Sequence, residues 1–146
     1  MAIGIYNVFD RTTDLPVTAS AVLVTAGISS PIAANQRQFL RYHLPISVGA
    51  TGGVRIQLVV PAGGVAFIAS IRLNNTVAPA VVVAEQIASA VFTNALANAG
   101  EHYIIVDAVV VNGITAGNVD MQIAQNTADA LTLTLRRGAN VRLVKL

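Results

Sequence analysis

Several residue types that carry chemistry are rare or missing in this chain of 146 residues. Cysteine is absent, which excludes disulfide bonds and thiolate metal sites, and tryptophan is absent as well. Charged residues make up only 11% of the chain, against about 25% in a typical soluble domain. The formal net charge of +2 is too small by itself to indicate a protein that binds nucleic acid.

The motifs that usually mark a catalytic or metal site are also missing. The two histidines, His43 and His102, lie far apart and belong to no metal-binding pattern. The loops Gly49–Gly53 and Gly63-Gly64 are rich in glycine but lack the Lys-Ser/Thr ending of a phosphate-binding loop. No serine stands in a Gly-x-Ser-x-Gly context, and no spacing among the seven carboxylates favours an acid/base pair. The sequence therefore predicts no catalytic residues, no cofactor and no metal, and we expect a protein that is not an enzyme.

Apolar residues are abundant, at 54% of the chain with a mean hydropathy of +0.65. No window holds about 18 uninterrupted apolar residues, so no membrane partner is predicted. A chain of this length forms one domain with a proper core. The excess of apolar residues then predicts an oligomer, in which further apolar surface is buried between subunits.

Alternation of apolar and polar residues is the main structural signal. Side chains alternate between the two faces of a strand, so this pattern predicts sheets with one dry face and one wet face. The predicted dry faces are Gln38, Leu40, Tyr42, Leu44 and Ile46; Val54, Ile56, Leu58 and Val60; Val65, Phe67, Ala69, Ile71 and Leu73; and Val119, Met121 and Ile123. Further strands are expected at 21–25, 28–33, 103–111, 131–135 and 141–146, separated by turn signals such as Asn35-Gln36, Pro61–Gly64 and Asn112-Gly113. The predicted fold is all-β, a two-sheet β-sandwich of jelly-roll or Greek-key type.

Two segments fit this rhythm less well. Residues 80–98 are rich enough in alanine to form an amphipathic helix closed by Gly100, but Val81–Val83 and Val91–Thr93 are strand formers. Two strands, or a strand and a loop, are the preferred interpretation, and a helix is the alternative. Residues 1–18 are the least sheet-like part, broken by Leu15-Pro16. Their apolar residues favour an N-terminal arm that packs on a neighbour, and a frayed end is the alternative. The sandwich domain is expected to span residues 19–146.

Basic residues gather near the end of the chain, at Arg136, Arg137, Arg142 and Lys145. This cluster fits a contact with an acidic partner surface or with phosphates. It also fits a solvated turn and strand edge, where charge discourages aggregation between sheets. No aromatic residue interleaves these charges for base stacking, so direct binding of nucleic acid is not predicted.

Seven short segments within residues 28–64 and 113–146 form a recognisable set. They are Ala33-Ala-Asn-Gln36, Phe39-Leu-Arg-Tyr42, Ala50-Thr-Gly-Gly-Val-Arg55, Val60-Pro-Ala-Gly63, Ala116-Gly-Asn-Val119, Gln122-Ile-Ala-Gln-Asn-Thr-Ala-Asp129 and Arg137-Gly-Ala-Asn-Val-Arg-Leu143. The most specific element among them is Ala-Gln-Asn-Thr at 124–127, ahead of an alternating strand and a glycine turn. Through these segments the chain resembles β-sandwich modules in structural proteins of tailed bacteriophages. The similarity covers about half of the chain and omits residues 80–98.

The resemblance implies a virion structural protein. A small chain of this kind is expected to be a capsid decoration (cement) protein, located on the capsid surface, which binds the major capsid protein as a homotrimer and stabilises the shell. The alternative is a tail-tip or fibre module for receptor binding or adhesion. The residues predicted to contact the capsid or a partner are Ile3, Ile5, Tyr6, Val8, Phe9, Arg136 and Arg137.

Overall fold

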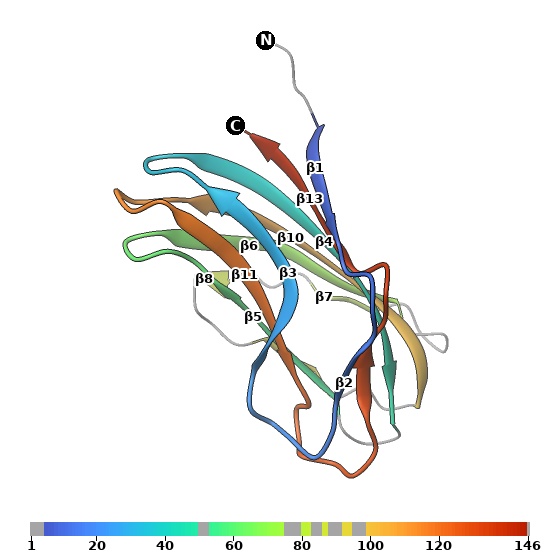
Figure 1. Ribbon diagram of the computed structural model, residues 1–146. Helices are drawn as coiled ribbons and strands as arrows, with labels where there is room; N and C mark the ends of the chain where they lie inside the picture. Colours follow the sequence, from blue (N-terminus) through green and yellow to red (C-terminus); the bar gives the residue numbers. More distant parts are fainter. Residues whose placement is uncertain are drawn as a thin grey trace.

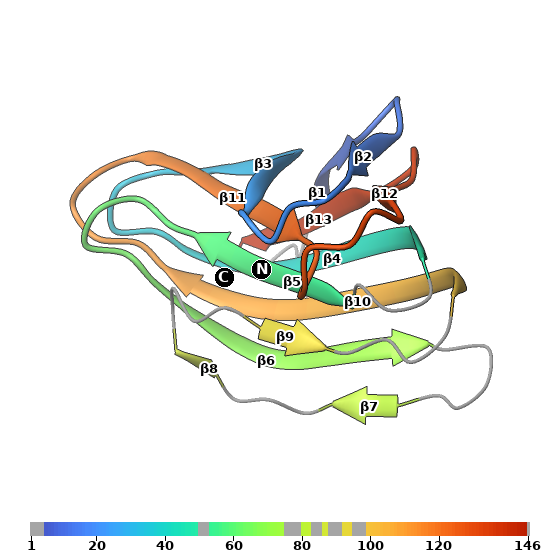
Figure 2. The ribbon, with the colours of Figure 1, turned by 90° about the horizontal axis from the view of Figure 1, so that it is seen from below.

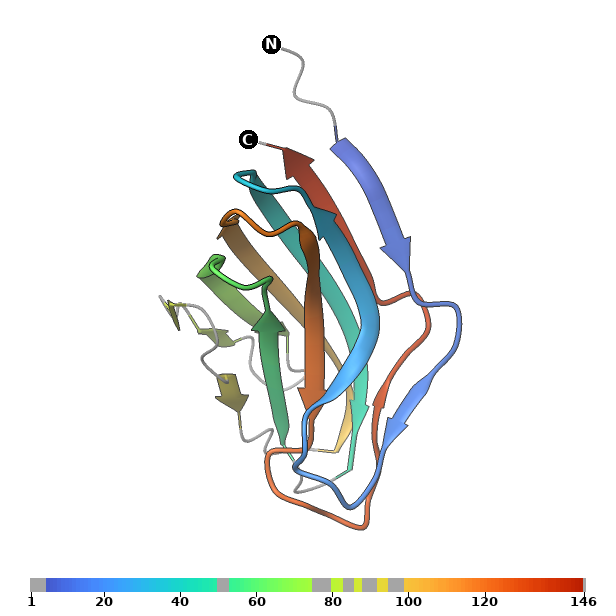
Figure 3. The ribbon, with the colours of Figure 1, turned by 60° about the vertical axis from the view of Figure 1, so that its left-hand side comes forward.

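The computed structural model describes residues 5–49, 53–74, 80–82, 86–87, 92–94 and 99–145. Its strands form two antiparallel sheets that lie face to face (Figures 1 and 3). The all-β sandwich predicted from alternation is confirmed. The larger sheet contains β1 (Ile5–Asp10), β13 (Asn140–Lys145), β4 (Arg37–Val48), β10 (Gly100–Val111), β6 (Val65–Asn74) and β7 (Ala80–Val82), in that order, with β8 (Gln86–Ile87) beside β6, β12 (Leu133–Leu135) beside β4, and β2 (Leu15–Val17) beside β12.

The smaller sheet contains β3 (Val24–Ile32), β11 (Gly117–Ala124), β5 (Val54–Val59) and β9 (Phe92–Asn94), in that order. Eight strands define the connectivity: β1, β3, β4, β5, β9, β10, β11 and β13. Numbered one to eight along the chain, they follow the order 1-8-3-6 in one sheet and 2-7-4-5 in the other, which is the jelly-roll topology. Beyond β10 the larger sheet continues with β6, followed by β7 and β8 at its edge (Figure 2).

The core between the sheets is built by the alternation seen in the sequence. In β4 every second residue is buried, from Gln38 to Val48. In β11 the buried residues are Val119, Met121 and Ile123, as predicted. Tyr42 is fully buried, and its hydroxyl lies 3.5 Å from the carbonyl oxygen of Val119. Burial, with a smaller effect of the Asp120 carboxylate, raises the pKa of Tyr42.

A β-bulge in β6 changes which residues of that strand face the core. Asp107 of β10 pairs with Ser70 of β6, whereas Ala108 pairs with Ile68, so one extra residue is inserted between them. Ile68 and Ile71 are buried, and Phe67 is 47% exposed on the outer face. The prediction that Val65, Phe67 and Ile71 share the dry face is therefore wrong for Val65 and Phe67.

Residues 80–98 contain strands where the structure describes them. β7 and β8 pair with β6, and β9 pairs with β5 of the smaller sheet. The described residues of this segment agree with the strand interpretation rather than with the helix. The prediction for residues 83–85, 88–91 and 95–98 lies outside the described residues.

The boundary expected between an arm and the sandwich at residue 18 does not match the sheet pairing. β1 pairs with β13 and β2 pairs with β12 in the larger sheet (Figure 1). Phe9 and Leu15 pack against the core, and Val17 is buried. The backbone of Arg11 exchanges hydrogen bonds with Gly138 and Ala139. Residues 5–17 therefore belong to the sandwich, because their backbone groups complete the edge beside β13 and β12.

Three turns that cross between the sheets meet at one end of the molecule, at residues 33–36, 60–64 and 112–116. The buried Asn112 joins the first and the third of them, since its Nδ2 donates to the carbonyl oxygens of Ala33 (2.9 Å) and Thr115 (2.8 Å). Gly113 approaches Gly63 so closely that a Cβ at position 113 would lie 2.7 Å from the Gly63 oxygen. Glycine is required there because only hydrogen fits between the two backbones.

The buried side chain of Gln125 organises the opposite end of the smaller sheet. Its Oε1 accepts hydrogen bonds from the backbone N–H groups of Ser20 (3.0 Å) and Asp129 (3.1 Å). Its Nε2 donates to the carbonyl oxygens of Asp129 (3.2 Å) and Leu131 (2.5 Å). Leu131 thus belongs to this loop and is 52% exposed, so the strand expected at 131–135 begins only at Leu133. The most specific element of the phage-module resemblance therefore contains a residue with a structural role.

Candidate functional site: the outer face of the larger sheet

Most side chains on the outer face of the larger sheet are partly buried by their neighbours. β4, β10, β6 and β13 contribute alternate residues to it, in register across the sheet. The described side chains of these four strands on this outer face are Arg37, Phe39, Arg41, His43, Pro45, Ser47, Val65, Phe67, Ser70, Arg72, Glu101, Tyr103, Ile105, Asp107, Val109, Val111, Asn140 and Arg142. Most are half-buried by their neighbours, and none belongs to the core between the sheets.

An apolar row crosses this outer face near the end where the three turns meet. Phe39 of β4 pairs with Val109 of β10, which pairs with Phe67 of β6. Phe67 is 47% exposed. Large apolar side chains that line up on an exposed sheet face are typical of surfaces that contact another protein.

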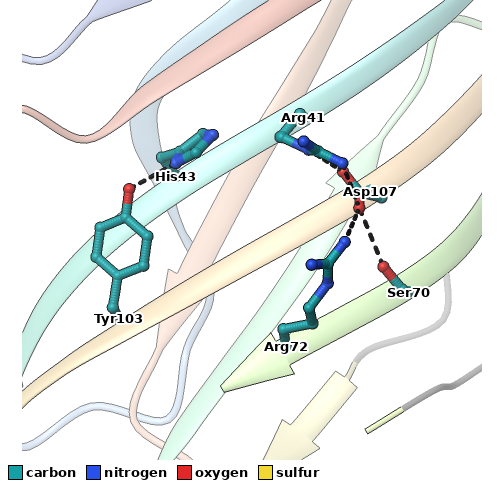
Figure 4. A network of polar contacts seen from close by, with 6 residues as sticks. All are labelled: Arg41, His43, Ser70, Arg72, Tyr103 and Asp107. Carbon is teal, nitrogen blue, oxygen red and sulfur yellow. Dashed lines mark hydrogen bonds and ion pairs between the residues drawn. The ribbon is translucent and has the colours of Figure 1, made fainter. Parts of the chain in front are cut away.

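A charged row runs beside the apolar one and is centred on Asp107 (Figure 4). The Asp107 carboxylate is 7% exposed. Arg41 binds it through two bonds, from Nε to Oδ1 at 2.6 Å and from Nη2 to Oδ2 at 3.0 Å. Arg72 Nη2 lies 3.1 Å from Oδ2, and Ser70 Oγ donates to the same oxygen at 3.2 Å. Two guanidinium groups therefore share one buried carboxylate.

This geometry shifts the acid–base equilibria of the network. Burial alone raises the pKa of Asp107, but the hydrogen bond from Arg41, the charges of Arg41 and Arg72 and the hydrogen bond from Ser70 together lower it below its ordinary value. The same contact raises the pKa of Arg41. Asp107 is therefore ionised at neutral pH, and Arg41 and Arg72 neutralise its charge.

Two further arginines on the outer face lie outside this network. Arg142 of β13 pairs directly with Arg41 of β4, and Arg37 lies beside Val111. Within the described residues, neither Arg37 nor Arg142 forms an ion pair. The described part of this face thus carries four guanidinium groups, those of Arg37, Arg41, Arg72 and Arg142. Its carboxylates are Asp107, Glu101, which pairs with Arg136, and Asp10 at the edge of the sheet. The part of this outer face around Asp107 is therefore cationic.

His43 and Tyr103 form a second contact on the same face. His43 Nδ1 and the Tyr103 hydroxyl are 2.5 Å apart, and the rings meet edge to face (Figure 4). Burial first, and then the charges of Arg142 and Arg41, lower the pKa of His43. Burial raises the pKa of Tyr103. Both groups are therefore neutral at pH 7, and they fix each other's orientation rather than supply charge.

Arg136 and Arg137, which the sequence predicts as partner contacts, lie at the opposite end of the sheet. Arg136 binds two carboxylates, Glu101 at 2.5 Å and Asp14 at 3.2 Å. The backbone N–H of Arg137 donates to Asp14, and this bond is the main reason why the pKa of Asp14 is lowered. These residues, with Glu101, Thr12 and Thr13, line a groove of about 640 Å³. Arg136 is thus engaged within its own chain, whereas the Arg137 side chain is exposed.

The predicted contact residues near the N-terminus lie on β1, the edge strand beside β13. Ile5, Tyr6, Val8 and Phe9 are residues of β1, and Phe9 packs against the core. Ile3 lies outside the described residues. The end of β1 lies beside the turn that carries Arg136 and Arg137, because Asp10 pairs with Asn140 and the backbone of Arg11 bonds Gly138 and Ala139. The contact of these residues with a partner stays a prediction.

Sequence reasoning did not identify the Asp107 network as a site. The alternation in β4 places Arg37, Arg41 and His43 on one face, and that part of the signal is visible in the sequence. Asp107 and Arg72 join them only through the order β4-β10-β6 and the bulge in β6. The described residues contain no group of three His, Asp or Glu side chains arranged to hold a metal ion. They also contain no helix long and apolar enough to cross a membrane.

Comparisons with known proteins identify no family for this chain. No protein-family model matches it, and no curated protein is significantly similar. A solved structure of infectious bursal disease virus, Gx strain, is 14% identical over 95% of this chain, with a TM-score of 0.21. This chain spans 40% of the length of that viral chain. A similarity this weak does not indicate a common function.

Proposed function

We propose that this chain is a virion structural protein that decorates the capsid of a tailed bacteriophage. In this proposal it binds the major capsid protein on the outer surface of the shell, as a homotrimer, and holds the shell against internal pressure through several weak contacts that act together. It uses no cofactor and catalyses no reaction. The proposal starts from the resemblance of residues 28–64 and 113–146 to structural modules of such phages.

The observation that carries the proposal is the outer face of the larger sheet. It presents a half-buried apolar row, including Phe67, next to a cationic row. A sheet face that served only as a wet surface would gain nothing from an exposed phenylalanine. A face that meets another protein gains from both features, because apolar burial gives affinity and charge gives orientation.

The test is to purify the chain and add it to particles of the encoding phage assembled without it. We expect saturable binding to the shell, seen by electron microscopy as regular added density, and a higher temperature of capsid disruption. Light scattering coupled to size exclusion should give three times the 15.1 kDa chain mass. Absence of binding to intact shells would reject the decoration function, whatever the oligomeric state.

A tail-tip or fibre receptor-binding module is the second candidate. The groove beside Asp14, Glu101 and Arg136 favours it, because hydroxyl and charged groups line a space of about 640 Å³ that is large enough for a sugar. In that case the chain should bind host surface glycans and label the tail tip rather than the shell. Immunogold labelling of intact virions separates the two functions.

A further inference from the structure

The outer face of the larger sheet carries two arginines, Arg37 and Arg142, that form no ion pair within the described residues. Asp107 already satisfies Arg41 and Arg72. Arg142 stands directly opposite Arg41 in the β13–β4 pairing, and in the described part of the chain no carboxylate pairs with it. Like charges opposite each other destabilise a sheet. The isolated fold therefore gains nothing from Arg142, and a carboxylate from outside would relieve the repulsion.

The charge lies next to apolar surface rather than alone. Phe39 and Phe67 lie in the adjacent register row with Val109 between them, and the Arg41 guanidinium carbon is 5.9 Å from the centre of the Phe39 ring. An apolar row beside arginines matches the composition of protein interfaces, in which aromatic residues and arginine are enriched. A phosphate backbone would use the arginines but not the apolar row.

A second copy of the same face does not complement this surface in charge. Two copies packed face to face would bring eight guanidinium groups, twice the four of one face, against Asp107 and Glu101 carboxylates that are already paired. That arrangement adds repulsion at the point of contact. Charge complementarity instead requires a partner whose surface carries carboxylates around an apolar patch.

We infer that the outer face of the larger sheet docks onto an acidic, partly apolar protein surface, with Arg37 and Arg142 as the charge contacts and Phe67 as an apolar contact. This inference rests on the proposed decoration function, in which that surface belongs to the major capsid protein. It places the shell contact on this sheet face rather than at Arg136 and Arg137 near the groove.

The test compares two double variants with equal charge. Arg37→Gln with Arg142→Gln lowers the formal net charge from +2 to 0 on the proposed face. Asn118→Asp with Thr25→Glu lowers it from +2 to 0 on the outer face of the smaller sheet. Each is added to particles assembled without this chain, at low and at physiological salt, and unfolding in urea is measured in parallel.

We expect the arginine variant to lose about tenfold or more in affinity for the particles at low salt, since exposed charge contacts are individually small but act together. Its stability in urea should match the wild type or exceed it slightly, because the Arg41–Arg142 repulsion is gone. The charge-matched control should keep the wild-type affinity. Wild-type binding should weaken with added salt, whereas binding of the arginine variant should depend on salt much less.

The possible failures are distinguishable. If the wild type does not bind particles, both the decoration function and the docking surface are rejected. If the wild type binds and the arginine variant binds equally well, only the docking surface is wrong. Loss of the trimer in the arginine variant would assign the face to a second copy. Equally tight, salt-dependent binding of the wild type to duplex DNA would assign it to nucleic acid. Either result overturns the inference.

Discussion

The two sheets have outer faces that differ in chemistry although the same alternation builds both. On the smaller sheet, the outward side chains of β3, β11 and β5 are mostly small or polar, including Ser29, Asp120 and Gln122. On the larger sheet, the outward positions hold aromatic and aliphatic residues together with arginines, and Asp107 is buried among them. One face is an ordinary wet surface, and the other has the composition of a contact surface.

The difference shows that alternation specifies which face of a strand packs in the core. It does not specify whether the other face meets solvent or another protein. In β11, Asp120 is partly exposed and has no ion pair among the described residues. In β10, Asp107 occupies a comparable outward position and is held by Arg41, Arg72 and Ser70. The two aspartates therefore offer a direct way to test whether the faces differ energetically.

The largest difference is expected on removing each carboxylate. Asp107→Asn leaves two guanidinium groups without their partner and should lower the free energy of unfolding by about 2 kcal/mol. The Arg41 and Arg72 side chains are 41% and 48% exposed, so water compensates part of the loss. Asp120→Asn should change stability by less than about 0.5 kcal/mol. Urea unfolding measures both, and equal effects would contradict the contrast between the faces.

The pH dependence of that difference gives a second test. Because the folded state lowers the pKa of Asp107, its ion pairs stabilise the protein above the pKa of the unfolded carboxyl, about 4. This contribution disappears as the pH falls through the lower pKa of the folded state. The stability gap between wild type and Asp107→Asn should thus be constant from pH 7 to 5 and close below pH 4. The subtraction cancels the contributions of Asp14 and Glu101, whose pKa values are also lowered.

A smaller effect is expected from the apolar row. Phe67→Ser should cost about 1 kcal/mol of stability, because nearly half of the side chain is already exposed. It should also reduce binding of a hydrophobic fluorescent dye to the isolated chain. Val59→Ser, at a 37% exposed position of the smaller sheet, is the matched control and should leave dye binding unchanged. A similar loss of dye signal in both variants would mean that the apolar surface is not concentrated on the larger sheet.

The smallest effect concerns His43. The charge of Arg142 helps to lower its pKa, so Arg142→Gln should raise that pKa, measured by NMR titration of the imidazole signals. Arg37→Gln removes the same charge from the same face, but Arg37 does not contribute to the shift and should leave the titration unchanged. An unchanged titration in Arg142→Gln would show that Arg142 points away from the His43–Tyr103 pair.

Much of the fold follows from the sequence alone. Period-two alternation at 38–48, 54–58 and 119–123 determined the buried faces of β4, β5 and β11, because apolar side chains two residues apart must share one side of a strand. Turn residues marked the crossings near Asn35, Pro61 and Asn112. The low charge and high apolar content predicted apolar surface that contacts another subunit, but they did not show which part of the molecule carries it.

The tertiary structure decided where that surface lies. Strand order is set by long-range pairing, so only the fold brings Arg41, Asp107 and Arg72 together from β4, β10 and β6. The bulge in β6 shifts the pleat by one residue, which turns Phe67 outward and places Ser70 opposite Asp107. The pairing of β1 with β13 likewise draws residues 5–10 into the sheet, although their local sequence looks like an arm. Local periodicity specifies the faces of each strand, whereas neighbours distant in the chain determine which faces meet.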